Sequence, residues 1–168
     1  MLPYRFCPKC GGRLKTAKPS APECRQCGFI FFQNSALAFG ALIIDARGRI
    51  LLARRKFAPQ KGKWDLLGGF LLYGEEAEDA VARELKEELG IKVKESRLIG
   101  TEVGDYLFQG IKFKTMNLFY LVSDWRGEIR PQDDVASVTW FNRKDLPRTG
   151  WAFGWITKAI KKWQRGEL

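Results

Sequence analysis

The apolar residues of this chain form short continuous runs in some segments and a helical repeat in others. The run at 36–44 and the run at 50–53 are separated by the turn residues 45–48, which predicts a buried strand and its hairpin partner. Similar runs predict four more strands, at 91–93, 98–103, 113–122 and 138–141.

One segment carries an apolar residue at every fourth position: Ala77, Val81, Leu85 and Leu89. This spacing predicts an amphipathic helix over 76–89, and Gly90 is placed to end it. The amphipathic segment 151–164 predicts a closing helix. Helices interspersed among strands indicate an α/β fold in which helices cover a β-sheet.

The four cysteines are confined to the first 27 residues, in the pairs Cys7/Cys10 and Cys24/Cys27. Two C-x-x-C pairs at this separation are typical of a tetrahedral Cys₄ zinc site, and a glycine after each pair lets the chain turn back toward the sulfurs. Two disulfides or a redox pair are the alternatives. We expect a structural zinc ribbon over 1–34, held together by the metal because so short a segment cannot build its own core.

Composition narrows the chemistry of the remaining residues, 35–168. The chain has no histidine, which excludes Ser-His-Asp and Cys-His nucleophile systems and histidine metal ligands. The net charge of +10 favours phosphate-rich partners such as nucleotides or RNA, although solubility alone also explains it. No apolar run is long enough to span a membrane and no signal peptide is evident, so we expect a cytoplasmic protein without a membrane partner.

Three carboxylates gather on one face of the predicted helix, since Glu84, Glu87 and Glu88 are spaced by three and four residues. Like charges at this spacing disfavour a helix, whereas a divalent cation would make the same arrangement favourable. Carboxylate oxygens suit Mg²⁺ or Mn²⁺. By themselves the three residues are equally compatible with an ordinary solvated face.

The residues around this cluster extend it into a longer motif. From Gly69 there are five residues to Glu75, then seven to the run Arg83-Glu84-Leu85-Lys86-Glu87-Glu88-Leu89-Gly90-Ile91. This arrangement matches the pattern G-x5-E-x7-R-E-U-x-E-E-x-G-U, with U aliphatic, at every defined position. The chain therefore resembles the Nudix hydrolases.

The resemblance implies an α/β/α sandwich around a mixed sheet and Mg²⁺- or Mn²⁺-assisted hydrolysis of a nucleoside diphosphate linked to another group. It implies that Glu84, Glu87 and Glu88 bind the metal, together with the backbone carbonyl of Gly68. It further implies that an ion pair between Glu75 and Arg83 ties the loop to the helix. Glycines at positions 68 and 69 would let phosphates approach the backbone closely.

A Cys₄ ribbon before this motif resembles the NADH pyrophosphatase branch of the family. The downstream signature of that branch, S-Q-P-W-P-F-P-x-S, is absent from residues 100–110. Its late glutamate is replaced by Ser137, and the nearest acids are Asp133 and Asp134. ADP-ribose, NAD(H) and other dinucleotides are therefore alternative candidates for the substrate.

Aromatic residues are the candidates for binding a base. In the branch that this chain resembles, aromatics at the positions of Phe32 and Phe70 stack on the substrate from different subunits of a homodimer. Trp64 and Phe70 flank the glycines at 68 and 69, and each is equally plausible as a core residue.

Two other functions remain as alternatives. The basic charge and the ribbon would suit an RNA 5′-end pyrophosphohydrolase of the decapping type. A nucleotide-sensing regulator that binds nucleic acid through its ribbon is the other, although the intact glutamates favour an enzyme.

Overall fold

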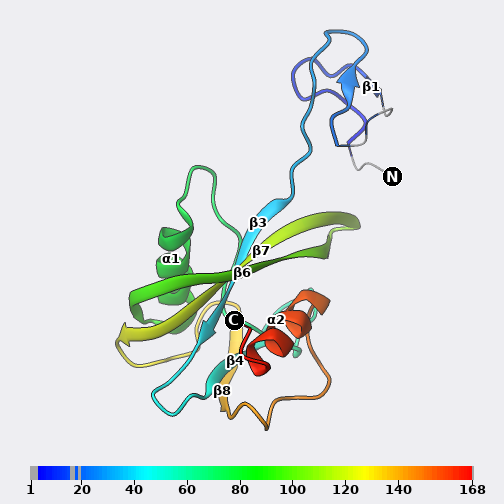
Figure 1. The fold of residues 1–168 in the computed structure, drawn as a ribbon. Coiled ribbons are helices and arrows are strands. Elements are labelled where there is room, and N and C mark those ends of the chain that lie inside the picture. Colours follow the sequence, from blue (N-terminus) through cyan, green and yellow to red (C-terminus); the bar gives the residue numbers. More distant parts are fainter. Residues whose placement is uncertain (1–3, 16–17, 19, 168) are drawn as a thin grey trace.

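The computed structural model describes residues 4–15, 18 and 20–167. In chain order, the elements are β1 (Leu14–Lys15), β2 (Glu23–Cys24), β3 (Ala36–Ile43), β4 (Ile50–Arg55), β5 (Trp64–Asp65), α1 (Ala77–Leu89), β6 (Lys92–Phe108), β7 (Ile111–Arg126), β8 (Val135–Phe141) and α2 (Gly154–Gln164). Figure 1 shows α1 and α2 on opposite sides of the strands, which is the expected α/β sandwich.

The strands beyond residue 35 form two three-stranded sheets. The first has the order β3-β7-β6 and is mixed, because β3 runs parallel to β7 whereas β6 and β7 form a long antiparallel hairpin. The second has the order β5-β4-β8 and is antiparallel. The mixed sheet that the family resemblance implies is therefore confirmed, but the division of the strands into two sheets was not expected.

Alternation along β3 and β4 sends neighbouring side chains to two different cores. Ile43 and Leu51 pack in the core beneath α1, whereas Leu42 and Leu52 pack in the core beneath α2. Both strands are consequently apolar, as expected for strands that are buried on both faces, except at the half-buried Arg54 and Arg55 that end β4.

The predicted hairpin between 36–44 and 50–53 is wrong. The two segments meet at a bridge between Ile44 and Ile50, and from there β3 pairs with β7 while β4 pairs with β5 and β8. Because both strands are buried on both faces, their hydrophobic pattern carried no information about which strand is the partner.

Two further boundaries differ from the prediction. The segments 91–93 and 98–103 belong to one strand, β6, whose register shifts at three places against β7. The closing helix begins at Gly154 instead of residue 151, because Trp151 forms a bridge with Trp64 and donates its indole N–H to the Pro147 carbonyl at 3.1 Å. The predicted helix 76–89 is confirmed as α1, with Glu76 as N-cap and Gly90 in the left-handed conformation at its end.

The N-terminal segment has a small core of its own, consisting of Cys7, Leu14 and Cys24 with Phe31 against it. Figure 1 shows this segment joined to the rest of the chain by an extended linker that leads into β3. In the part of the chain that the structure describes, neither helix has the length and apolar character needed to cross a membrane.

Candidate active site

The loop that contains Gly68 and Gly69, called the glycine loop below, lies at the centre of the candidate site. It follows the edge of β3 that does not pair with β7. The Phe39 and Ala41 amides donate to the carbonyls of Gly69 and Leu67 at 2.9 and 2.8 Å. Gly68 has φ +139°, and a Cβ there would lie 2.4 Å from the Phe39 carbonyl oxygen. A Cβ on Gly69 would lie 2.4 Å from Glu84 Oε1. Position 68 therefore requires glycine, since its backbone contacts β3, whereas a side chain at position 69 would displace the Glu84 carboxylate of α1.

Arg83 connects an acid of the loop before α1 with two acids on the helix. It forms a bidentate ion pair with Glu75, at 2.7 Å from Nε and 3.0 Å from Nη2. Its Nη1 donates to Glu84 at 2.8 Å and to Glu87 at 3.2 Å. The hydrogen bonds from Arg83 and from the Leu72 amide lower the pKa of Glu75 to about 2, so this carboxylate is ionised in the folded protein. The loop and the helix are thus joined by the ion pair that the family motif implies.

Glu88 is the most buried acid of the cluster, with 4 % of its surface exposed. Its Oε2 accepts the Gly68 amide at 2.8 Å. Burial raises its pKa well above the ordinary value, and the nearby charges of Asp134 and Glu84 add to this effect. Burial likewise raises the pKa of Glu84, although Arg83 opposes that shift. The negative charge of the acidic cluster is therefore only partly neutralised by cationic side chains of the protein.

The two candidates for the late acid differ in their surroundings. Asp134 is half-buried, and its charge raises the pKa of Glu84, Glu88 and Asp65. Asp133 is exposed, has φ +48°, and contacts Lys56 Nζ through its carbonyl oxygen at 3.0 Å. Of the two, only Asp134 changes the pKa of acids on α1.

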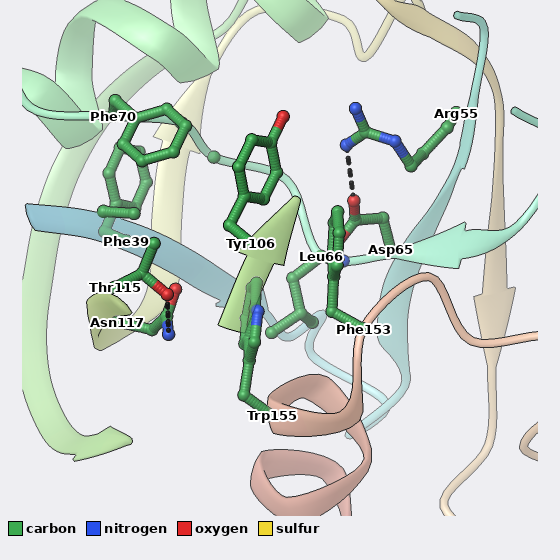
Figure 2. A pocket seen from close by; sticks show the side chains of 13 residues that line it. Phe39, Arg55, Asp65, Leu66, Phe70, Tyr106, Thr115, Asn117, Phe153 and Trp155 are labelled. Carbon is green, nitrogen blue, oxygen red and sulfur yellow. Dashed lines mark hydrogen bonds and ion pairs between the residues drawn. The ribbon is translucent and has the colours of Figure 1, made fainter. Parts of the chain in front are cut away.

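An aromatic pocket opens on the other side of the glycine loop (Figure 2). Its lining includes Gly68 and Gly69 and is completed by Ala38, Phe39, Arg55, Asp65, Leu66, Phe70, Tyr106, Thr115, Asn117, Phe153 and Trp155. Tyr106 lies between Phe70 and Phe153, with ring centroids 5.3 and 5.4 Å away. Flat apolar walls beside a few polar groups are typical of sites for aromatic ligands.

Asp65 is the buried acid of this pocket and was not singled out from the sequence. Its Oδ2 accepts from Arg55 Nη1 at 2.7 Å, and its Oδ1 accepts the Leu66 amide at 2.9 Å. Burial raises its pKa to about 6 in spite of the Arg55 charge. The pair lies at the edge of the aromatic wall, where the Arg55 guanidinium is 5.5 Å from the centre of the Phe153 ring.

The aromatics predicted from the sequence have different positions. Phe70 lines the pocket and is 40 % exposed. Trp64 does not line it, because its ring packs edge-on against Phe141 at 5.1 Å and beneath the Arg54 guanidinium at 3.5 Å. Phe32 lies in the linker and is 66 % exposed within this single chain.

The pocket residues that the sequence did not reveal come from scattered positions. Thr115 and Asn117 are polar residues two positions apart on β7, a strand that also carries charged residues, and Tyr106 lies within 100–110, where the NADH pyrophosphatase signature is missing. Alternating polarity in β7 was the available signal. It could not show that those positions converge with Phe153 and Trp155 from the start of α2.

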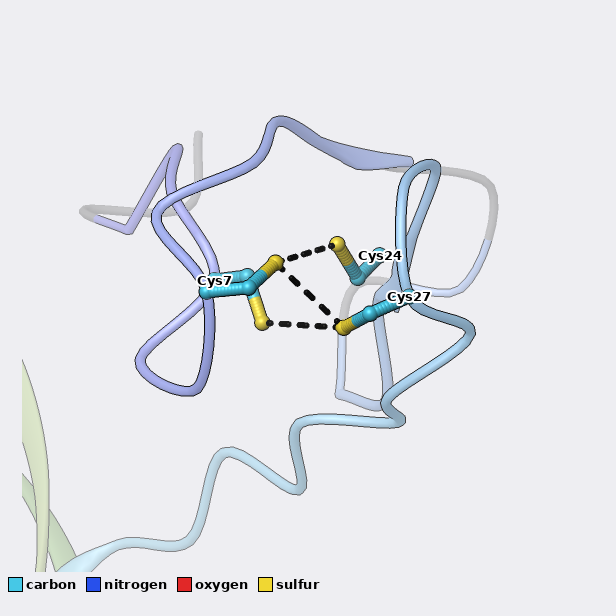
Figure 3. Close-up of side chains that lie close together, drawn as sticks. Cys7, Cys24 and Cys27 are labelled. Carbon is cyan, nitrogen blue, oxygen red and sulfur yellow. Dashed lines mark hydrogen bonds between the residues drawn. The ribbon is translucent and has the colours of Figure 1, made fainter.

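The four cysteines form a tight group at the tip of the N-terminal segment (Figure 3). Their sulfurs lie within 4.8 Å of one another, and the described residues contain no other such group of metal-ligating side chains. The nearest pairs are 3.4, 3.5 and 3.8 Å apart, which is too far for a disulfide and close to the ~3.8 Å of a tetrahedral Cys₄ zinc site. Gly11 and Gly28 adopt the left-handed conformation after each pair, and the Lys9 and Gln26 amides point at Cys7 and Cys24 sulfurs, each at 3.4 Å.

Known proteins resemble this chain over most of its length. It is 33 % identical over 160 residues to an NAD-capped RNA hydrolase, NudC, of Vibrio parahaemolyticus, covering 93 % of this chain and 57 % of that protein. It is 32 % identical over 124 residues to an ADP-ribose pyrophosphatase of Methanocaldococcus jannaschii, covering 74 % of this chain and 72 % of the relative. The chain thus spans little more than half the length of the NudC relative.

Solved structures and the family comparison agree with this similarity. The crystal structure of a MutT NUDIX hydrolase from Burkholderia pseudomallei matches with a TM-score of 0.66 and 31 % identity, covering 77 % of this chain and 98 % of that one. The NUDIX domain family matches residues 34–159, a range that contains the glycine loop, α1 and the aromatic pocket. The chain belongs to the NUDIX domain family.

Proposed function

We propose that the protein is a Mg²⁺- or Mn²⁺-dependent hydrolase that cleaves the diphosphate bond of a nucleoside diphosphate linked to another group, such as ADP-ribose or NAD(H). The observation that carries this proposal is the position of the glycine loop between the acids of α1 and the aromatic pocket. A diphosphate lying across Gly68 and Gly69 would have the acids on one side and its base on the other. The similarity to an ADP-ribose pyrophosphatase and to NAD-capped RNA hydrolases supports the same substrate class.

The acids of α1 fit a hard divalent cation. Glu88 is buried, has like charges near it, and keeps one carboxylate oxygen free of the Gly68 amide. Glu84 and Glu87 share the guanidinium of Arg83. We assign these three carboxylates, with the Gly68 carbonyl, as the metal ligands. When bound, the metal neutralises charge on the diphosphate and lowers the pKa of the attacking water.

Other residues of the chain have supporting roles in the proposal. The ion pair with Glu75 fixes Arg83, which in turn holds Glu84 and Glu87 in place. Asp134 is positioned to influence the same cluster and is our candidate for accepting a proton from water. The close approach at Gly68 and Gly69 leaves no side chain between the backbone and a phosphate.

A substrate panel tests the proposal directly. The protein is incubated with ADP-ribose, NADH, NAD⁺, dinucleoside polyphosphates and nucleotide sugars, each with Mg²⁺ or Mn²⁺, and released mononucleotide is measured. We expect AMP from at least one substrate that contains ADP, and no release in the presence of a chelator. Hydrolysis of none of these compounds would overturn the proposal.

A second substrate class is favoured by one observation. The first residues of α2 line the pocket, and the same helix carries Lys158 and Lys161, whose side chains reach solvent. RNA that continues from an adenine nucleotide would meet these cations, and the NudC relatives are named as NAD-capped RNA hydrolases. An oligonucleotide with an NAD cap, compared with free NAD⁺ at about 50 and about 200 mM salt, separates the two substrates. A preference for the capped RNA that disappears at high salt would support RNA as the substrate.

We also propose a structural Zn²⁺ bound by Cys7, Cys10, Cys24 and Cys27. The sulfur distances and the two amides directed at sulfur support this assignment. Elemental analysis should find about one zinc per chain, and Cys24→Ser should lower this content. Disulfides in freshly reduced, metal-replete protein would contradict it.

Finally, we propose that the protein acts as a homodimer in which Phe32 of one subunit approaches the pocket of the other. The exposure of Phe32 and Phe70 in the single chain supports an additional contact at both rings. Sedimentation at several protein concentrations tests the dimer, and a monomer at enzyme-assay concentrations that is fully active would refute the shared site.

A further inference from the structure

Two polar side chains lie at the floor of the aromatic pocket, in an otherwise apolar environment. Thr115 and Asn117 point from β7 toward α2, and only 2 % and 1 % of their surfaces are exposed. The next residue on the same face, Phe119, belongs to the core beneath α2. Polar groups buried this deeply cost stability unless their hydrogen-bonding capacity is used.

The hydrogen bonds of this pair leave one acceptor and one donor free. Asn117 Nδ2 donates to the Glu102 carbonyl at 3.1 Å and to Thr115 Oγ1 at 3.0 Å, so both amide hydrogens are used. Among the described residues, the structure gives Asn117 Oδ1 no donor and the Thr115 hydroxyl hydrogen no acceptor. The orientation of the amide follows from the neighbouring Glu102 carbonyl, which can only accept.

The sheet around this pair is hollowed by small residues. A Cβ on Gly104 would lie 2.5 Å from the Trp155 ring, 2.9 Å from Asn117 Nδ2 and 3.0 Å from Thr115 Oγ1. On β3, Ala38 also lines the pocket, and a Cβ on Gly40 would be 3.4 Å from the Trp155 ring. The small residues therefore allow Trp155 to pack low against the sheet and keep space above the polar pair.

The free groups lie where a flat ring would be held. Figure 2 shows Thr115 and Asn117 below Phe70 and Tyr106. Trp155 and Phe153 lie to the right of this pair, beside α2. Gly68 and Gly69 line the same pocket. A ring placed here would have aromatic neighbours on its faces, and its edge would be directed at the Thr115–Asn117 pair.

We propose that Asn117 and Thr115 read the edge of the substrate's heteroaromatic ring. Asn117 Oδ1 accepts a hydrogen bond from an amino or amide N–H on the ring, and the Thr115 hydroxyl donates to a neighbouring ring nitrogen or carbonyl oxygen. Adenine offers this edge through its 6-amino group and a ring nitrogen, and nicotinamide offers it through its carboxamide. The inference rests on the proposed function and names the residues that determine its specificity.

Binding to metal-free protein tests this proposal without requiring hydrolysis. Calorimetry compares AMP with purine riboside 5′-monophosphate, which lacks the amino group. It also compares nicotinamide mononucleotide with nicotinic acid mononucleotide, which has a carboxylate in place of the carboxamide. We expect the wild type to bind the N–H-bearing member of at least one pair about tenfold more tightly. The pair that shows the preference identifies the ring.

Substitutions then assign the preference to the polar pair. Asn117→Leu should abolish the preference, and Thr115→Val, which has nearly the same shape, should reduce it. Asn142→Leu is the matched control, because Asn142 is exposed and outside the pocket, and it should bind like the wild type. Melting curves accompany each variant, and Thr115→Val decides the question if Asn117→Leu does not fold.

Several outcomes would overturn the proposal. Two of them concern the wild type, namely equal affinity within both pairs and binding of none of the four nucleotides. A preference that persists in folded Asn117→Leu, or in Thr115→Val where the former does not fold, would show that the pair only supports the sheet. Because these measurements need no metal and no turnover, a protein that fails the hydrolysis panel but shows the expected preference would refute the activity alone.

Discussion

On the acidic side of the glycine loop, the proposed metal ligands come from one helix and the loop that precedes it. On the aromatic side, the pocket residues come from β3, β4, β5, β6, β7 and the segment at the start of α2. The first side has fixed spacing along the chain, because a helix places residues three and four apart on one face. The second side depends on strand pairing, and its members are spread along the chain from Ala38 to Trp155. A motif can describe the first side but not the second.

The largest expected effect is on the acidic side. Glu84→Gln and Glu88→Gln should each lower kcat by at least ~100-fold, because each removes a charged oxygen that we propose as a metal ligand. Folding should be preserved, since the glutamine at 88 retains an oxygen for the Gly68 amide. Glu95→Gln, an exposed carboxylate on β6, is the control. Near-normal turnover in both variants would contradict the assignment of Glu84 and Glu88 as metal ligands, and with it the functional difference between the acidic and the aromatic side.

Asp65 on the aromatic side and Glu75 on the acidic side should respond oppositely to pH in the metal-free protein. Burial raises the pKa of Asp65 to about 6, so the folded state binds an extra proton between the ordinary value of 3.8 and about 6. The free energy of unfolding should therefore fall as pH rises through this window, by something on the order of 2 kcal/mol. Asp65→Asn should lack this fall, as measured by urea unfolding at both ends of the window.

Glu75 provides the opposite sign on the acidic side. Its pKa is lowered to about 2 from 4.5, so its stabilising contribution is present above pH 4.5 and is lost as pH falls toward 2. The difference in stability between wild type and Glu75→Gln should accordingly shrink in acid. The differences in the free energy of unfolding from wild type, for Asp65→Asn and for Glu75→Gln, are compared across pH. If both differences changed in the same direction, the difference in burial between the two acids would have no energetic consequence.

A smaller effect is expected at the aromatic wall. Phe70→Ala and Phe32→Ala should each lower kcat/KM by about tenfold through a higher KM, because stacking contributes roughly 1–3 kcal/mol per base. The melting temperature should change little, because both rings are substantially exposed. Phe57→Ala, another exposed aromatic, is the control. Destabilisation of roughly 3–5 kcal/mol with normal binding by the folded fraction would assign the rings to the core instead.

The smallest effect concerns how α1 is attached to the sheet. The Tyr120 hydroxyl donates to Glu78 Oε1 at 2.9 Å, a bond that contributes to raising the Tyr120 pKa to about 12, after burial. Tyr120→Phe should lower the free energy of unfolding by about 1 kcal/mol and leave kcat unchanged. A loss of turnover at unchanged stability would contradict this expectation. It would indicate that the hydrogen bond from Tyr120 positions α1 for the reaction.

The same contrast explains what the sequence could predict. The helix α1, its Gly90 end and the convergence of the four cysteines follow from local spacing, and the ion pair between Arg83 and Glu75 follows from the family motif. The partner of β3 does not, because a strand buried on both faces has no polar edge to mark its neighbours. Asp65 and Asn117 are single polar residues whose importance depends on burial, and burial is set by elements far away in the chain.

The glycine loop also has a consequence for how such proteins diversify. It is only one backbone thick: a Cβ on Gly68 would clash with the Phe39 carbonyl, and a Cβ on Gly69 would displace the Glu84 carboxylate. The acids of α1 lie on one side of this loop and the strand residues of the aromatic pocket lie on the other, so the two groups contribute to the site separately. Mutations at positions such as Tyr106, Thr115 and Asn117 can therefore change which molecule is recognised while the reaction chemistry is inherited intact. A single scaffold can in this way give rise to a lineage of enzymes that share a reaction and differ in the compounds they consume.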